Sequence, residues 1–108
     1  MENQDKDNKK LRNLCAVSKM VTEGRQPIQY MVREASLGKY EDGVYDSGWM
    51  MMTGEESLDY VDNPDNIDYI PLSAVIAIDP RILPYLDAPQ GSEWEWDENK
   101  KDFVRVTG

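Results

Sequence analysis

The chain has 108 residues with 21 acidic and 12 basic side chains, a net charge of −9, which fits one small acidic domain rather than two. Its 40% hydrophobic and 31% charged residues are typical of a folded domain and exclude wholesale disorder. No apolar run approaches the roughly 20 residues of a membrane-spanning helix, and the N-terminus lacks the apolar stretch of a signal peptide. We therefore expect a cytoplasmic protein that does not enter a membrane.

The first part of the chain is predicted to change from disordered to folded near residue 13. Residues 1–12 are polar, charged and without periodicity, which predicts a disordered tail before a single domain at 13–108. A short buried strand is expected at residues 14–17. It contains the only cysteine of the chain, Cys15, which we interpret as a buried hydrophobic residue rather than a reactive thiol.

The segment after this strand carries a helix signal and then a strand signal. Ser18 can cap a one-turn helix over residues 19–23. Residues 28–33 alternate between two faces, which predicts a half-buried strand. Its apolar face is expected to hold Ile28, Tyr30 and Val32. The glycines and scattered charges of residues 35–47 then predict a long mobile loop.

The middle of the chain is predicted to form a central strand followed by a capped helix. Residues 49–52 are apolar on both faces, as in a strand at the centre of a sheet. Thr53 and Glu56 match the capping-box pattern, in which each side chain accepts a hydrogen bond from the other residue's amide. A helix of about two turns is expected to follow, with Leu58 and Val61 on its inner side.

The second half of the chain alternates between short strands and short helices. We expect a strand at 67–72, a helical turn over 72–76, a helix beginning at Asp79, a strand holding Trp94 and Trp96, and a last strand at 103–106. This order predicts an α+β fold with a mostly antiparallel sheet of about five to six strands and two or three short helices.

The negative charge is concentrated in one block. Between Glu41 and Pro80 there is no lysine or arginine, and this block holds ten of the 21 acidic residues. Such a field repels nucleic acid and anionic membranes and attracts basic partners. The alternative interpretation is charge that serves only solubility.

The residue inventory argues against catalysis and against a bound metal. The chain has no histidine, which removes the commonest general base, nucleophile activator and metal ligand. One cysteine cannot supply a zinc site. Residues 62–68 resemble a calcium loop, but Pro64 and Ile67 stand where that loop needs an oxygen ligand and a glycine. We expect a polar turn there, no metal, no cofactor and no enzyme activity.

The aromatic residues and the methionines could serve the core or a contact surface. In a thin core we favour core positions for the three tryptophans and six tyrosines. Alternation places Met51 with Trp49 on one face of the central strand and Met50 with Met52 on the other. If one of these faces is accessible to solvent, its methionines form a soft and adaptable contact surface.

Several stretches occur together in an order that resembles one bacterial family. They are Cys15-Ala16-Val17-Ser18, Tyr30-Met31-Val32-Arg33-Glu34, Asp46-Ser47-Gly48-Trp49, Thr53-Gly54-Glu55-Glu56, Ile78-Asp79-Pro80 and the segment from Pro84 to Ser92. Over about residues 13 to 106 the chain resembles the immunity protein 33-like family. The resemblance lies in the order and spacing of these stretches, because none of them is a catalytic signature.

The resemblance implies a small α+β domain that binds and blocks a bacterial toxin, with no catalytic residues and no cofactor. Many toxin domains are nucleases with basic clefts, which an acidic protein can occupy. We expect the carboxylates of the short helix to be the main contact residues, and those of the long loop are the second choice. These residues are Glu55, Glu56, Asp59 and Asp62, and then Glu41, Asp42 and Asp46.

Two other functions stay open on the sequence alone. The first is a stand-alone domain that binds a small molecule or a protein and has no toxin partner. The second, and weakest, is a hydrolase that uses paired carboxylates. An adjacent toxin gene would favour the immunity function, and a deep pocket with paired carboxylates of raised pKa would favour the hydrolase.

Overall fold

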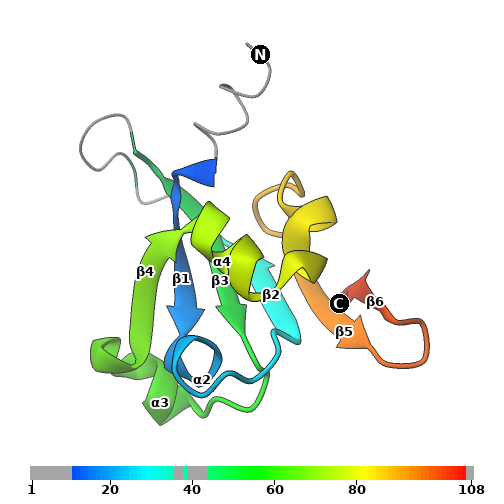
Figure 1. Cartoon of the computed structure of the whole chain (residues 1–108), viewed down its shortest axis with the longest axis horizontal. Coiled ribbons are helices and arrows are strands. Elements are labelled where there is room, and N and C mark those ends of the chain that lie inside the picture. The colour runs from blue at the N-terminus through cyan, green and yellow to red at the C-terminus, as the bar shows by residue number, and fades with distance from the viewer. Residues whose placement is uncertain (1–10, 36–37, 39–43, 107–108) are drawn as a thin grey trace.

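The fold consists of one six-stranded sheet with short helices. The computed structural model describes residues 11–35, 38 and 44–106, and the sheet order is β4-β1-β3-β2-β5-β6 (Figure 1). The strands are β1 (Leu14–Ser18), β2 (Tyr30–Arg33), β3 (Asp46–Met52), β4 (Ile67–Pro71), β5 (Glu93–Asp97) and β6 (Asp102–Arg105). The helices are α2 (Lys19–Thr22), α3 (Leu58–Asp62), α4 (Leu72–Ile78) and the 3₁₀ helices η1 (Pro64–Asn66) and η2 (Pro80–Tyr85).

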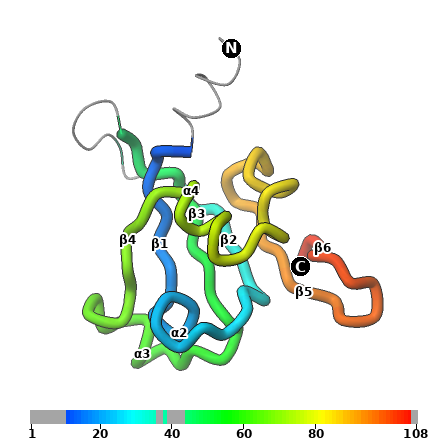
Figure 2. The backbone as a smooth tube through the Cα atoms, viewed as in Figure 1, coloured from blue at the N-terminus to red at the C-terminus, as the bar shows by residue number. Residues whose placement is uncertain are grey.

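The strand pairing confirms the α+β prediction. Strands β1 and β3 are parallel, whereas the β1–β4, β2–β3, β2–β5 and β5–β6 pairs are antiparallel. The predicted central strand is β3, which lies between β1 and β2 (Figure 2). Residues 1–10, which hold most of the predicted tail, lie outside the described part of the chain.

The long loop predicted at residues 35–47 ends earlier than expected. Asp46 and Ser47 already belong to β3, and residues 36–37 and 39–43 lie outside the described part. Polar residues such as these are typical of loops, so the sequence did not indicate a strand here. In the structure both side chains accept hydrogen bonds from the backbone of β3 itself. The Asp46 carboxylate accepts from the Gly48 amide at 3.1 Å, and the Ser47 hydroxyl accepts from the Trp49 amide at 3.2 Å.

The core lies between the sheet and the layer formed by α2, α4 and η2 (Figure 1). Cys15, Val17, Trp49 and Met51 reach it from β1 and β3, each with at most 1% of its surface exposed. Burial raises the pKa of the Cys15 thiol well above its usual range, so the thiol stays protonated. The interpretation of Cys15 as a buried hydrophobic residue is confirmed.

The predicted face of the strand at residues 28–33 is wrong. Met31 is fully buried, whereas Tyr30 and Val32 are only half-buried on the other side of the sheet. Register explains the difference, because Met31 pairs with Met51, whose side chain faces the core. Ile28 is also fully buried, but it precedes the first residue of β2, so its burial does not determine which face of the strand is inside.

The capping signals are correct for α2 and wrong for α3. Ser18 caps α2 by accepting from the Met20 amide at 3.1 Å. Glu56 does accept from the Thr53 amide at 2.9 Å, but this bond closes a turn, and α3 begins only at Leu58. Gly54 has a φ of +92°, which lies outside the right-handed helical region and which glycine adopts readily. Leu58 is 83% exposed and therefore is not on an inner side of the helix.

The C-terminal strands are attached to the core through aromatic side chains. Trp94 and Trp96 are partly buried against it, which agrees with the predicted core positions, whereas Tyr45 and Tyr69 are 47% and 54% exposed, so the core prediction is wrong for these two tyrosines. The ring of Trp96 lies 5.1 Å from that of Phe103, and the Arg81 guanidinium lies 4.2 Å from the Trp96 centroid and 5.6 Å from the Phe103 centroid. These contacts hold β5 and β6 against η2.

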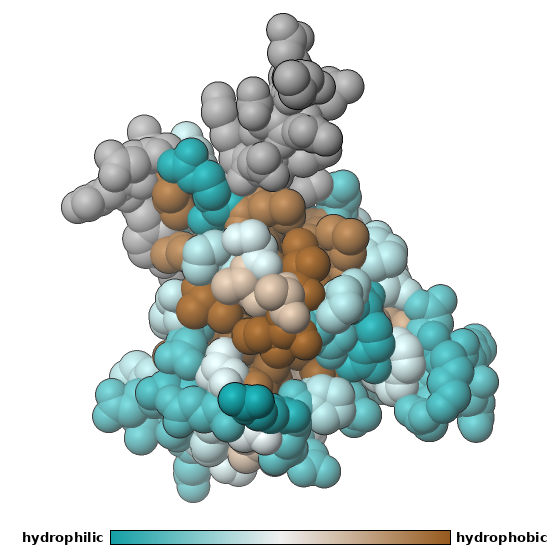
Figure 3. Space-filling model, viewed as in Figure 1, coloured by the Kyte–Doolittle hydropathy of each residue, from teal (hydrophilic) through white to brown (hydrophobic). Residues whose placement is uncertain are grey.

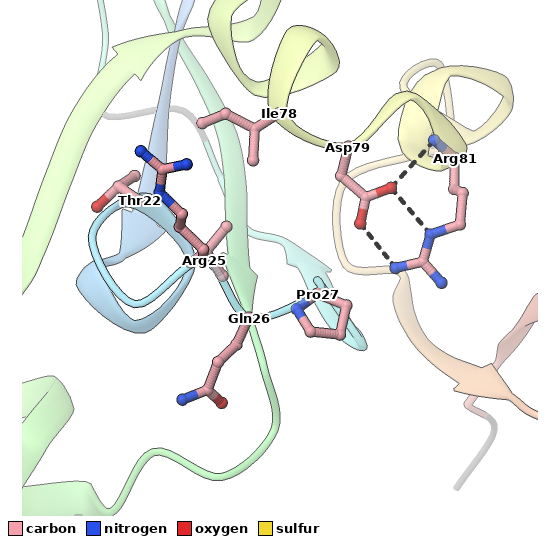
Figure 4. A pocket seen from close by; sticks show the side chains of 8 residues that line it. Thr22, Arg25, Gln26, Pro27, Ile78, Asp79 and Arg81 are labelled. Carbon is pink, nitrogen blue, oxygen red and sulfur yellow. Dashed lines mark hydrogen bonds and ion pairs between the residues drawn. The ribbon is translucent and has the colours of Figure 1, made fainter.

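Asp79 starts η2 as predicted and anchors Arg81. Its carboxylate accepts from the Arg81 amide at 3.2 Å and from the guanidinium at 2.6 and 2.8 Å (Figure 4). Burial alone would raise the pKa of Asp79, but the hydrogen bonds and charge of Arg81 together hold it below the ordinary value of 3.8. The helix is 3₁₀ rather than α, and its Pro84 has no amide to donate.

Asp79 makes the stability of the protein dependent on acid. A carboxylate with a depressed folded pKa contributes stability above its unfolded pKa and loses it as the pH falls through the folded value. The free energy of unfolding should therefore decrease below about pH 4, and Asp79→Asn should flatten that decrease. Urea unfolding between about pH 6 and pH 3 measures it. Equal pH dependence in the two proteins would contradict this role for Asp79.

Candidate functional site

The sheet face opposite the core is partly exposed to solvent. Register places one set of side chains on it, because residues paired across neighbouring strands share a face. We call this surface the open face. It consists of Ala16, Tyr30, Val32, Met50, Met52, Tyr69, Glu93 and Glu95, which are all half-buried or exposed. The predicted alternation of Met50 and Met52 against Trp49 and Met51 is thus confirmed.

The helix α3 lies over the open face and separates two grooves. Its Val61 lines both of them. The smaller groove, of about 350 Å³, has Ala16 and Met50 in its lining and Tyr69 beside them. The larger groove, of about 570 Å³, is lined by Tyr30, Met52 and Leu58 among others.

Carboxylates line both grooves. Glu34, Asp46 and Asp62 border the smaller groove, and Glu55, Glu56 and Glu95 border the larger one. Among the described residues, neither groove has a lysine or an arginine in its lining. The open face therefore combines apolar and thioether surface with a concentration of negative charge.

The pKa of Tyr30 is raised by burial and by this negative charge. Its hydroxyl donates to the Glu93 carboxylate at 2.5 Å. Burial and this bond raise the pKa of Tyr30 to about 12. The neighbouring carboxylates of Glu95 and Glu34 act in the same direction, because a negative environment disfavours a phenolate.

The helix side of the molecule has a different character. A groove of about 560 Å³ lies there between α2 and η2, with Arg25 and Arg81 in its lining (Figure 4). Apolar residues gather next to it over α4 (Figure 3). Its only carboxylate among the described lining residues is Asp79, which already holds Arg81. A basic partner thus has less to gain on this side than on the open face.

The predicted contact residues fall into different environments. Glu55, Asp59 and Asp62 are exposed, although Asp59 lines neither groove. Glu56 is half-buried and also accepts from the Gly54 amide at 2.9 Å. Burial would raise the pKa of Glu56, but hydrogen bonds from the Thr53 amide and the Ser18 hydroxyl lower it. Glu56 therefore holds the turn as well as contributing charge.

The loop residues of the predicted contact set contribute less. Asp46 lines the smaller groove, but it is only 8% exposed and its carboxylate accepts from its own strand, so we assign it mainly to the fold. Glu41 and Asp42 lie outside the described residues. The acidic block is therefore not one surface: Asp79 is buried, and Asp68 accepts from the Thr22 hydroxyl at 2.6 Å on the helix side.

Sequence reasoning missed the carboxylates that come from outside the acidic block. Glu93 and Glu95 reach the open face because β5 pairs with β2, and Glu34 follows the end of β2. The signal for the first two was present in the alternation of acids with Trp94 and Trp96. It indicated that the acids lie opposite the tryptophans, but not which strand would be their neighbour.

The described residues contain no group of three or more histidine, cysteine or acidic side chains that could hold a metal ion. Residues 62–68 form the end of α3, the helix η1 and the start of β4, which is the predicted polar turn. In the same part of the chain, no helix has the length and hydrophobicity needed to span a membrane.

The chain thus forms a small α+β domain with a carboxylate-lined, partly apolar sheet face. Residues 15–107 match the family model described as the immunity protein Imm33 domain. This chain belongs to that family, whose members are generally not enzymes. Searches of curated proteins and of solved structures gave no match.

Proposed function

We propose that this protein is a non-enzymatic immunity protein that binds a basic toxin domain in the cytoplasm and occludes its active cleft. The observation that carries the proposal is the carboxylate lining of the open face in a member of an immunity family. A protein that occupies a cleft needs only complementary shape and charge, which agrees with a chain without histidine.

The exposed carboxylates around α3 suit this task. Glu55, Asp59 and Asp62 form no ion pair with any described lysine or arginine, so their charge is available to a partner. Such charges mainly increase the rate of association with a basic surface, and salt screens them. The same field would repel the phosphates of a nucleic acid.

Charge reversal at Glu55 and Asp59 tests the proposal. We expect the double variant Glu55→Lys with Asp59→Lys to associate with a purified cognate toxin domain roughly 10- to 100-fold more slowly at low salt. The difference should shrink at high salt. Stopped-flow or surface-plasmon measurements give the rate constants.

The matched control is Glu23→Lys. Glu23 has a side chain 70% exposed at the end of α2, on the helix side of the molecule. The substitution Glu23→Lys should leave the rate of association nearly unchanged. An unaltered rate in the double variant, with the wild type still binding, would show that these carboxylates are not contact residues. Absence of binding by the wild type would refute the immunity function itself.

A stand-alone domain that binds a small molecule is the second candidate. The larger groove, of about 570 Å³, is within the range of ligand pockets. Its carboxylates would select a cationic ligand. A pull-down from the native cell at low salt separates the two functions, because recovery of the toxin supports immunity and recovery of no protein supports the alternative.

A further inference from the structure

We infer that the partner docks on the open face and inserts apolar side chains into the two grooves beside Val61 from a segment flanked by lysine or arginine. This inference rests on the proposed function and names the surface and the chemistry of the partner. The inference adds the requirement that the partner also presents apolar side chains, because any basic protein would meet a requirement for charge alone.

The apolar side chains at the base of the open face do not take part in the core, so a partner can contact them. In β3, Trp49 and Met51 supply the core and are at most 1% exposed, whereas Met50 and Met52 on the opposite face are only half-buried. Unbranched thioether side chains adapt their shape to a partner. An apolar sheet face that is left partly exposed marks a contact surface more often than an isolated exposed residue does.

The rim of the open face carries two large exposed side chains. Leu58 is 83% exposed at the start of α3, and Tyr69 is 54% exposed on β4. Each lines a different groove, with Val61 between the two grooves. Leu58 has no role in capping, since Ser57 accepts from the Tyr60 amide at 3.1 Å to hold the helix. Both side chains are therefore free to pack against a partner.

The carboxylates around the grooves indicate that the apolar side chains of the partner are accompanied by basic residues. Six carboxylates border the two grooves, namely Glu34, Asp46, Glu55, Glu56, Asp62 and Glu95. Burying them against an apolar surface would cost free energy unless a cation paired with each buried one. Arginine or lysine next to the inserted apolar residue meets that need with charge-assisted hydrogen bonds.

The helix side fits this partner poorly, although it is also apolar. Figure 3 shows apolar residues over α4, where Ile78 is 45% exposed. Leu83 of η2 is 53% exposed. The adjacent groove carries Arg25 and Arg81 (Figure 4), which would repel a basic segment. This side therefore supplies matched control residues.

Truncation of exposed residues on the two sides tests the inference. We expect Leu58→Ala and Tyr69→Ala each to weaken binding of the purified toxin domain about ten-fold, mainly through faster dissociation. Leu83→Ala and Ile78→Ala, which remove similar exposed side chains on the helix side, should leave affinity unchanged. Isothermal titration calorimetry gives the affinities, and melting temperatures verify that all four variants stay folded.

The outcomes separate this inference from the proposed function. If the wild type binds the toxin and only the helix-side variants weaken binding, the docking surface is wrong and the immunity function stands. Unchanged affinity in all four variants, with charge reversal still slowing association, would also overturn the apolar requirement. If the wild type does not bind the toxin, the function and the inference both fail.

Discussion

Gly48→Ala is expected to lower the free energy of unfolding by about 3 kcal/mol or more. A Cβ at this position would lie 2.1 Å from the carbonyl oxygen of Glu34 in the backbone, and the residue is at φ +83°. The clash cannot be relieved by rotating a side chain. It would push β3 from the end of β2 and break the 2.7 Å bond from the Glu34 amide to the Gly48 carbonyl.

Gly91→Ala is the control for Gly48→Ala. Gly91 has a similar φ of +91°, but a Cβ there would meet nothing within 4 Å. Gly91→Ala should lower the free energy of unfolding by only about 1 kcal/mol, because only the backbone conformation is unfavourable for alanine. Urea unfolding of both variants measures the difference between them. Equal costs would show that the close approach of Glu34 to Gly48 is not a constraint in solution.

Trp49→Ala should be the most damaging truncation in the core, at about 3–5 kcal/mol. Trp49 is 1% exposed in the central strand, and its indole donates to the Leu86 carbonyl at 3.1 Å. The loss would leave a large cavity beneath η2. That carbonyl would still accept from Arg33 at 3.3 Å, so the cost arises mainly from lost packing.

Trp49→Phe separates packing from hydrogen bonding. Phenylalanine keeps much of the apolar volume and removes the indole donor, so we expect about 1–2 kcal/mol. Thermal unfolding compares the two variants, and a loss of 1 kcal/mol corresponds to roughly 4–8 °C for a domain of this size. A phenylalanine variant as unstable as the alanine variant would assign the cost to the hydrogen bond.

Local signals were sufficient for most strands because their causes are local. Apolar alternation placed β5, with Trp94 and Trp96 on one face. The apolar run of residues 49–52 identified β3 as the central strand. Ser18 and Asp79 marked helix starts correctly, because a side chain that caps a helix is only two residues from the amide it accepts from.

The errors occurred where distant parts of the chain determine the outcome. Whether Met31 or Tyr30 faces inward depends on the register between β2 and β3, which alternation alone does not provide. Asp46 was assigned to the loop because aspartate is typical of loops, whereas in the structure its carboxylate accepts from the Gly48 amide within β3. The turn at Gly54 follows from a left-handed backbone, and the capping pattern of Thr53 and Glu56 does not contain that information.

The candidate site was only half predictable for the same reason. Sequence identified Glu55, Asp59 and Asp62 as exposed acids, but it could not show that Glu95 lies across the same groove. That neighbour follows from the pairing of Tyr30 with Glu95 between β2 and β5. Met50 and Met52 became a candidate surface only when the structure showed which face the helices leave exposed.

The position of β1 has a consequence for how quickly the open face can form after synthesis. It is the first strand of the chain, yet in the sheet it lies between β3 and β4, both of which come later. On the ribosome it must wait until the chain beyond Pro71 has emerged before both its edges are paired. Such non-local pairing slows folding. Because Ala16 of β1 lines the smaller groove, the surface that we propose for the partner is completed only by this late step.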